Sequence, residues 1–386
     1  MKICVICGAP PDNADGVGDF AWLLAQELSK GNRVSYIVPG SGDAKRCLDG
    51  GSIGIYWVKR GWGIRTSKEV LRTVKRLQPE ILLVHFVPQL YGWNGAKPLL
   101  ALLLLRLKRM GYPIVTVAHE FSVPFGPSPK LMLWATIHRV LFRLIVASSS
   151  RVVTTTRFCC NLLARRFSRR QTDLHQIPVS SAIPAMPIDE SQKQALRIQL
   201  GIAADDLVVS TFGSVMRSTA HHLEELFCWF VREYAPVRLL VIGKAGEAMR
   251  QKTSHGSRLP GQITFTGPLS QQEVSKYLSL SDLYVMLYPD GASMRRTSLL
   301  AGLAHGLPTV SNVGVLTDPL LASSEVLHLI DDPPSEKETA VLRQLCRDSV
   351  RRRELGTRAR AFYEHWFSWE KIGQQYQQVL REALAE

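Results

Sequence analysis

The stretch YPDGASMRRTSLLAGLAHGLPTVSN, Tyr288 to Asn312, holds a loop, a helical pattern and a strand-like segment in that order. The strand-like run Leu283–Leu287 comes directly before it, and Gly306 and Pro308 mark the turn after the helix. Strand, helix and strand in succession are typical of a β-α-β unit in a parallel sheet. This stretch therefore predicts an α/β fold, with a loop at the carboxyl end of one strand.

The loop places two arginines where the helix is expected to begin. The charges of Arg295 and Arg296 oppose the positive N-terminal end of the helix dipole, so they do not help the helix itself. A guanidinium binds phosphate oxygens through a planar fork of N–H donors and stays charged at any working pH. Ser293, Thr297 and Ser298 add hydroxyl donors. We therefore expect a bound anion here, the alternative being two arginines that are only solvated.

The same alternation of strands and helices extends through both halves of the chain. In the second half we expect strands at Leu207–Phe212, Arg238–Ile242, Ile263–Thr266 and Thr309–Ser311, and helices over Leu223–Arg232 and Gln271–Leu280. In the first half we expect strands at Ile3–Cys7, Val34–Val38, Ile53–Val58, Ile81–Phe86, Ile114–Val117 and Arg151–Thr155. Helices are expected there at Gly18–Ser29, Ser67–Leu77, Leu99–Met110 and Leu131–Val146.

These patterns predict two Rossmann-like α/β domains that face a central cleft. The Pro-rich segment Ile177–Pro187 is interpreted as the linker between domains at 1–180 and 181–365. A C-terminal helix over 366–386 carries apolar residues at helical spacing. We expect this helix to cross back onto the first domain, the alternative being a packing helix of the second domain.

The composition points to a globular protein with an anionic partner. The chain has 386 residues, 46% of them hydrophobic, and a net charge of +14 with a pI near 9.6. A basic balance favours phosphorylated metabolites, an acidic membrane surface or nucleic acid. Aromatic residues are not interleaved with the lysines and arginines, so nucleic acid is not expected as a partner.

The cysteines and apolar runs indicate a cytoplasmic protein. Cys4 and Cys7 have CxxC spacing but lie in a strand-like run with no second pair, so we expect reduced thiols rather than zinc. The N-terminal sequence lacks the pattern of a signal peptide. The longest apolar run, Pro98–Leu105, is far shorter than the roughly 20 residues of a membrane-spanning helix, and no integral membrane segment is expected.

Loops after the strands of the first half offer candidate binding residues. The segment PPDNADGVGDF, Pro10 to Phe20, joins a strand to a helix, and Gly16, Val17 and Gly18 would let the backbone approach an anion. The alternative is a plain strand-to-helix turn. His119 follows the strand-like VTVA, where it could bind a sugar hydroxyl. His85 ends its own strand in the same way and is the weaker candidate, and either histidine could be structural.

The second half offers a matching set of loop residues. Gly213 and Arg217 follow its first strand, and Lys244 follows its second. All three could meet a phosphate, although a single cation in a loop is often only solvated. Gly267 and Leu269 follow the third strand, where the backbone could read the edge of a base.

Taken in order, these motifs resemble the GT-B fold glycosyltransferases of the retaining family-4 group. The resemblance extends from the first loop through VTVAHEF, IPVSSAIP, FGSVMR, VIGKAGE, FTGPL and RRTSLLAGLAHGLPTV to the terminal FSWEKI helix. It implies that the second domain binds a nucleotide-diphosphate sugar and that the first binds the acceptor. It also implies that His119 contacts the transferred sugar, that Gly16 and Gly18 approach the donor phosphates, and that Leu269 meets the base.

Two departures from that family concern the donor site. The family usually carries two glutamates eight residues apart, and their places hold Ser293 and Ala301 here. The family's Lys-Gly pair after the first strand of the second domain is also missing, and Arg217 or the pair Arg295 and Arg296 could replace its charge.

The expected reaction is glycosyl transfer with retention, without a metal or cofactor, in polysaccharide biosynthesis. Arg295 and Arg296 would stabilise the leaving diphosphate, and no Asp-x-Asp metal motif stands in a suitable loop. The acceptor would be a cell-surface glycan or a lipid-linked saccharide. The basic, apolar segment Pro129–Val146 would make peripheral contact with an anionic membrane on its inner face, or else be a buried helix. The alternatives are a catalytically silent nucleotide-sugar-binding or scaffold protein, and a nucleotide-sugar epimerase.

Overall fold

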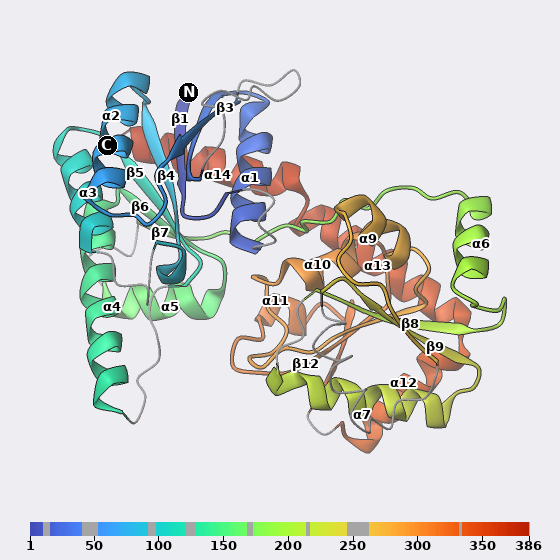
Figure 1. Ribbon diagram of the computed structural model, residues 1–386. Helices are drawn as coiled ribbons and strands as arrows, with labels where there is room; N and C mark the ends of the chain where they lie inside the picture. The colour runs from blue at the N-terminus through green and yellow to red at the C-terminus, as the bar shows by residue number, and fades with distance from the viewer. Residues whose placement is uncertain are drawn as a thin grey trace. The chain divides into compact units, whose positions relative to one another are not determined.

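The computed structural model describes residues 1–10, 16–40, 53–91, 98–120, 128–167, 173–213, 217–244, 262–331 and 334–385 (Figure 1). The chain divides into two compact units, each with its own sheet and core. The first unit comprises Met1–Pro178 and Trp369–Glu386, and the second comprises Val179–Ser368. The first unit is therefore built from two separate segments of the chain.

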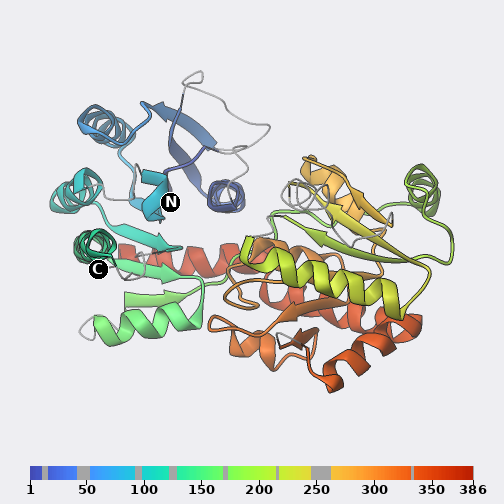
Figure 2. The same cartoon turned by 60° about the horizontal axis from the view of Figure 1, so that its bottom comes forward.

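The first unit contains a seven-stranded parallel sheet with strand order β3-β2-β1-β4-β5-β6-β7. Its strands are β1 Lys2–Cys7, β2 Arg33–Pro39, β3 Ile53–Val58, β4 Ile81–Phe86, β5 Ile114–Ala118, β6 Arg151–Thr154 and β7 Leu174–Gln176. All five β5 residues and all six β4 residues are buried, as expected for strands covered on both faces. Figure 2 shows β5, β6 and β7 following one another, with α5, Arg157–Arg166, beside β7.

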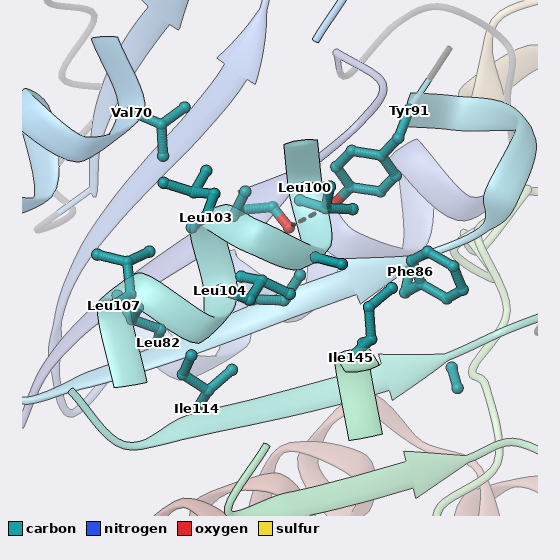
Figure 3. Packing of buried hydrophobic residues seen from close by; sticks show 14 of the residues in the cluster. Val70, Leu82, Phe86, Tyr91, Leu100, Leu103, Leu104, Leu107, Ile114 and Ile145 are labelled. Carbon is teal, nitrogen blue, oxygen red and sulfur yellow. Dashed lines mark hydrogen bonds between the residues drawn. The ribbon is translucent and has the colours of Figure 1, made fainter. Parts of the chain in front are cut away.

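Helices pack on this sheet and complete the core of the first unit. They are α1 Gly16–Ser29, α2 Ile64–Leu77, α3 Pro98–Arg109, α4 Pro129–Ser148, α5 and α14 Trp369–Leu384, with a short 3-10 helix at Pro88–Tyr91. Figure 3 shows Leu100, Leu103, Leu104 and Leu107 of α3 packed with Leu82 of β4 and other apolar residues. Burial of this apolar surface is the main stabilising term for the unit.

The C-terminal helix α14 packs on α1 within the first unit, which is the arrangement the sequence predicts. Phe20 of α1 lies with its ring centroid 5.5 Å from that of Trp369 and 6.3 Å from that of Tyr376. Gly373 allows the close approach, because a Cβ there would stand 2.6 Å from Cγ of Glu27.

Helix α4 is the one helix of the described residues that is long and apolar enough to cross a membrane, by length and composition alone. A third of its most apolar window is buried in the unit, and Phe142 and Ile145 belong to the core. The sequence analysis looked for a membrane span only in uninterrupted apolar runs, and it considered this segment, which Lys130, Arg139 and Arg143 interrupt, only for peripheral membrane contact or burial.

The second unit contains a six-stranded parallel sheet with strand order β10-β9-β8-β11-β12-β13. Its strands are β8 Leu207–Phe212, β9 Val237–Ile242, β10 Ile263–Phe265, β11 Leu283–Met286, β12 Thr309–Asn312 and β13 Leu327–Ile330. Its helices are α6 Glu190–Gln199, α7 Arg217–Glu233, α9 Gln271–Leu278, α10 Thr297–Ala304, α11 Pro319–Ala322, α12 Glu336–Arg347 and α13 Ser349–Trp366. In Figure 1, α9, α10 and α13 lie on one side of this sheet, and α7 and α12 lie on the other.

The structure confirms the α/β class and the two parallel sheets, and it corrects several details. Helix α10 begins at Thr297 rather than at Arg295, because Arg296 is the N-cap with an extended backbone. The segment interpreted as a linker is packed from Val179 onward: the backbone N–H of Val179 donates to Met294, and Ser180 is fully buried. The short elements α5, β7, α6, α11 and β13 have weak patterns, and the sequence-based prediction missed them.

Candidate donor site and histidine pair

Three glycines line the carboxyl edge of the second sheet. Gly213, Gly243 and Gly267 follow the neighbouring strands β8, β9 and β10, with φ of 95°, 81° and 71°. Residues that carry a Cβ rarely adopt this left-handed backbone conformation, so glycine is favoured at all three turns. Gly243 and Gly267 form a β-bridge, and the backbone N–H of Gly243 donates to Oγ1 of Thr266 at 3.0 Å. The result is an edge formed by main chain rather than by side chains.

The loop between β11 and α10 is held by specific contacts within the second unit. The backbone N–H of Tyr288 donates to Oδ1 of Asn312, and Nδ2 of Asn312 donates to the Tyr288 carbonyl, both at 2.8 Å. Oη of Tyr288 and Oγ of Ser298 are hydrogen-bonded at 2.8 Å. A Cβ at Gly213 would stand 3.4 Å from Cβ of Ser298, so the first turn of α10 touches the glycine edge.

The two arginines of this loop share one carboxylate. Arg295 and Arg296 each donate through Nη2 to a different oxygen of Asp290. Burial favours a raised pKa for Asp290, but the guanidiniums, Arg296 above all, outweigh it and hold the pKa below its ordinary value. The guanidinium of Arg296 also lies over the Tyr288 ring. In this structure both arginines are thus paired with a carboxylate of the same loop, and the bound anion that the sequence predicts beside them stays a prediction.

The three charges leave this loop with a net positive charge of one. Each guanidinium carries five N–H donors in a fixed fork, so an ion pair with one carboxylate oxygen does not exhaust its capacity. The side chains of Arg295 and Arg296 keep 21% and 22% of their surface exposed. A phosphate could therefore bind beside Asp290 or replace it.

The positions of the family's two glutamates are buried. Ser293 and Ala301 are both 0% exposed, and Oγ of Ser293 has no hydrogen-bond partner among the described residues. The hydroxyl of Ser293, which the sequence analysis proposes as a donor, therefore lies inside the unit. Neither residue presents a group at the surface of the glycine edge.

The remaining donor candidates lie at the same edge or outside the described residues. Thr297 begins α10 and is partly buried, Leu269 follows Gly267 and is partly buried, and Lys244 is exposed after β9. Arg217 begins α7, but its side chain lies outside the described residues, as do the residues directly after Lys244.

In the first unit, the glycines of the first loop begin α1. A Cβ at Gly16 would meet nothing within 4 Å, whereas a Cβ at Gly18 would stand 3.1 Å from the carbonyl oxygen of Pro10. Gly18 thus permits a close approach of the helix to the end of β1, while Gly16 is open. Val17 lies between them and is partly buried, and residues 11–15 are outside the described part.

Two histidines meet at the carboxyl ends of β4 and β5. Nδ1 of His85 lies 3.1 Å from Nε2 of His119, and the rings stack with centroids 5.4 Å apart. His85 is 0% exposed and His119 8% exposed. Burial lowers the pKa of His119 to about 4, and burial together with its neighbour lowers the pKa of His85. Both imidazoles are therefore neutral near pH 7.

Aromatic side chains surround the pair. The ring of Phe20 stands edge-on to both histidines, with centroids 6.0 Å from His85 and 5.6 Å from His119. Trp369 and Tyr376 of α14 pack against Phe20 in turn. The C-terminal helix thereby helps to form the apolar setting that keeps the histidines neutral.

Sequence reasoning proposed His119 and ranked His85 below it, but it did not foresee that they would touch. The sequence did show that both histidines lie at the ends of strands. That these two strands, β4 and β5, are neighbours became clear only from the strand order of the sheet. Asp290 was also missed as the partner of the arginines, although it lies in the same quoted loop.

Comparison with known proteins supports the assignment of an α/β fold with two parallel sheets. Residues 14–179 match the family model described as Glycosyltransferase Family 4. No curated protein sequence matches the chain.

Solved structures resemble the whole chain. The sucrose-phosphate synthase of Thermosynechococcus elongatus superposes with a TM-score of 0.72 at 16% identity, covering 100% of both chains. WaaG, a glycosyltransferase involved in lipopolysaccharide biosynthesis, gives 0.68 at 15% identity over 98% of this chain and 99% of that one. Anabaena Alr3699/HepE, solved with UDP and glucose, gives 0.69 at 16% identity over 99% and 100%. The predicted GT-B fold is confirmed.

Proposed function

We infer that this chain, which has the GT-B fold and matches Glycosyltransferase Family 4 over residues 14–179, is a glycosyltransferase that uses a nucleotide-diphosphate sugar. The observation that carries this proposal is the pair Arg295 and Arg296 at the start of α10, where α10 touches the glycine edge at Gly213. UDP is the first nucleotide to test, because Anabaena HepE was solved with UDP and with UDP-glucose.

The proposed chemistry depends on where charge develops. As the bond from sugar to phosphate breaks, negative charge grows on the diphosphate and positive charge on the sugar ring. The guanidiniums of Arg295 and Arg296 and the first N–H groups of α10 would stabilise the leaving group where its charge develops. Since these groups supply fixed positive charge, we propose transfer without a metal or another cofactor. Retention of configuration is proposed from the family resemblance.

Before a donor binds, Asp290 is the anion that pairs with Arg295 and Arg296. It neutralises half of the charge of the two arginines and orients their forks before any ligand arrives. A bound diphosphate carries more charge than one carboxylate, so it can compete for the same N–H donors. We therefore expect Asp290 to orient the two guanidiniums and to lower the affinity for the donor diphosphate modestly.

The first unit is the proposed acceptor side. His119 is proposed to contact the transferred sugar, and the open Gly16 to let the start of α1 approach the donor phosphates. The proposed acceptor is a cell-surface glycan or lipid-linked saccharide, in line with polysaccharide biosynthesis.

A peripheral contact with an anionic membrane is proposed for α4. Leu131, Met132 and Leu133 in its first turns are 41%, 52% and 61% exposed, and Lys130 beside them is exposed. Apolar side chains beside a basic residue suit the interface of an anionic bilayer. We accordingly propose a cytoplasmic protein that binds the inner face of the membrane peripherally.

The donor site is tested by replacing both arginines. Arg295→Ala/Arg296→Ala should lower the rate of sugar transfer by roughly a hundredfold or more, and weaken UDP binding in calorimetry. The control Arg353→Ala/Arg358→Ala removes the same charge from exposed positions of α13 and should change neither. Full activity of the first variant would overturn the phosphate role. UDP binding without any transfer across a nucleotide-sugar panel would favour the silent alternative.

Metal independence and retention need separate measurements. Transfer by the wild-type protein should persist in excess EDTA, and the product anomer, read by NMR, should match the donor anomer. Loss of transfer in EDTA with recovery on adding Mg²⁺ would contradict the first proposal.

The membrane contact is tested by vesicle sedimentation. The protein should bind phosphatidylcholine vesicles that contain phosphatidylglycerol at low salt, and less at high salt. Leu131→Gln/Met132→Gln/Leu133→Gln should lose this binding, whereas Ile198→Gln, at a still more exposed apolar position of α6, should retain it. Equal binding by both variants would remove the proposal.

A further inference from the structure

We propose that His85 is a positioning residue that holds His119 in the neutral tautomer with its hydrogen on Nδ1. The inference rests on the proposed function, in which His119 contacts the transferred sugar, and it adds which hydrogen-bonding group His119 offers. Its starting observation is the 3.1 Å contact between Nδ1 of His85 and Nε2 of His119.

The sheet fixes the backbone positions that carry the two histidines. In the parallel pairing of β4 and β5, His85 is the partner of Val117, and Phe86 is the partner of Ala118. The backbone N–H of His119 then donates to the carbonyl of Phe86 at 3.1 Å, which extends the ladder by one residue. The carbonyl of His85 accepts from Oη of Tyr91 at 2.6 Å. These main-chain contacts fix the positions from which the two rings approach each other.

Only one hydrogen can lie between the two nitrogens that face each other. Burial disfavours the charged form of either ring, so each imidazole carries one hydrogen. Either His85 donates from Nδ1 and His119 accepts at Nε2, or the direction is reversed. The tautomer follows from which direction leaves the remaining nitrogens better satisfied.

The remaining nitrogen of His85 decides between these two cases. Nε2 of His85 is buried and has no hydrogen-bond partner among the described residues. If His119 donated, Nε2 of His85 would carry a hydrogen and be a buried N–H donor without an acceptor. Orphaned buried N–H donors are rarer than orphaned acceptors, and each costs about 1–3 kcal/mol. His85 therefore donates, and its own Nε2 is left as a bare acceptor.

The consequence is a defined chemistry for His119. With Nε2 accepting from His85, the hydrogen of His119 lies on Nδ1, at the residue that keeps 8% exposure. This group can donate to a sugar oxygen, but it cannot accept from a hydroxyl at the same atom. His119 then acts as a neutral hydrogen-bond donor rather than as a proton shuttle.

The test reads the tautomer directly. Long-range ¹H–¹⁵N spectra of histidine-labelled wild-type protein should show the hydrogen of His119 on Nδ1. His85→Asn, whose amide can still donate from nearly the same place, should keep that signature. His85→Leu should lose it and show a mixture of tautomers. Thermal unfolding of both variants, and of His365→Asn at an exposed position, separates loss of the tautomer from loss of the fold.

Kinetics give the second readout. His85→Leu should lower kcat for sugar transfer roughly 10–100-fold with little change in KM for the donor, and His85→Asn should recover most of it. A wild-type His119 with its hydrogen on Nε2, or a folded His85→Leu that keeps the Nδ1 signature, would overturn the inference. An Nδ1 hydrogen that depends on His85, in a protein that transfers no sugar, would uphold it and refute only the proposed function.

Discussion

The guanidinium carbon of Arg296 lies 4.7 Å from the centre of the Tyr288 ring. The same tyrosine is hydrogen-bonded through Oη to Ser298 of α10 at 2.8 Å. Tyr288 thus joins the strand end, the arginine and the helix in one rigid arrangement. A cation above an aromatic face gains about 0.5–1 kcal/mol when partly exposed, which favours one orientation of the fork.

Two substitutions of Tyr288 should separate the contribution of its ring from that of its hydroxyl. Tyr288→Phe removes one hydrogen bond and should lower the free energy of unfolding by about 1 kcal/mol while leaving UDP affinity near that of the wild type. Tyr288→Leu also removes the ring beneath Arg296 and should weaken UDP binding severalfold. Calorimetry and thermal unfolding measure both effects. Equal UDP affinities for the two variants would show that the stacked ring does not matter.

Gly302 should not tolerate a side chain. A Cβ there would stand 2.2 Å from Cδ1 of Tyr284 and 3.0 Å from Oγ1 of Thr309, inside a closely packed part of the second unit. Gly302→Ala should therefore lower the free energy of unfolding by roughly 1–3 kcal/mol or more. Gly31→Ala, where a Cβ meets nothing within 4 Å, should stay within about 0.5 kcal/mol of the wild type.

Restoring the family's glutamate should disrupt the second unit. Ala301 is 0% exposed, so Ala301→Glu would bury a carboxylate for which no partner is in place. We expect a loss of several kcal/mol in stability, or no soluble protein, and no gain in sugar transfer. Ala204→Glu, at an exposed position, is the matched control. A folded and more active Ala301→Glu would show that position 301 can reach the donor.

The histidine pair should make stability depend on pH. The pKa of His119 is lowered to about 4 and that of His85 is also lowered, whereas histidines of the unfolded chain titrate near 6.5. Between about pH 4 and about pH 6.5 the unfolded chain binds more protons than the native state, so stability falls as the pH falls through this window. The total effect is on the order of a few kcal/mol.

The variant His119→Gln, which does not titrate, tests this account. Its melting temperature should fall less than that of the wild type between pH 7 and pH 5. If the melting temperatures of the two proteins fell by the same amount between pH 7 and pH 5, the histidine pair would not control the acid sensitivity.

Much of the fold follows from local pattern. Apolar runs such as Ile81–Phe86 give buried strands, and the Pro and Gly residues around Leu307 end a helix. Boundaries were less predictable where side chains override the pattern. Helix α10 begins at Thr297, later than expected, because Arg296 has an extended backbone and pairs with Asp290.

The candidate site was predictable in its residue types more than in its partners. Arg295, Arg296 and the glycines after the strands could be chosen from the sequence, because charge and turn chemistry are local properties. The burial of Ser293 could not, because exposure depends on elements far away in the chain.

The sequence by itself determined the alternation of strands and helices, the basic charge and the loops at the carboxyl ends of strands. Periodicity and charge belong to neighbouring residues, and a reader of the chain can see them. Only the tertiary structure decided that His85 meets His119 across 34 positions, and that Ser293 is buried. Those outcomes depend on which strands pair and which apolar faces are buried together, and this is settled by the packing of the whole chain.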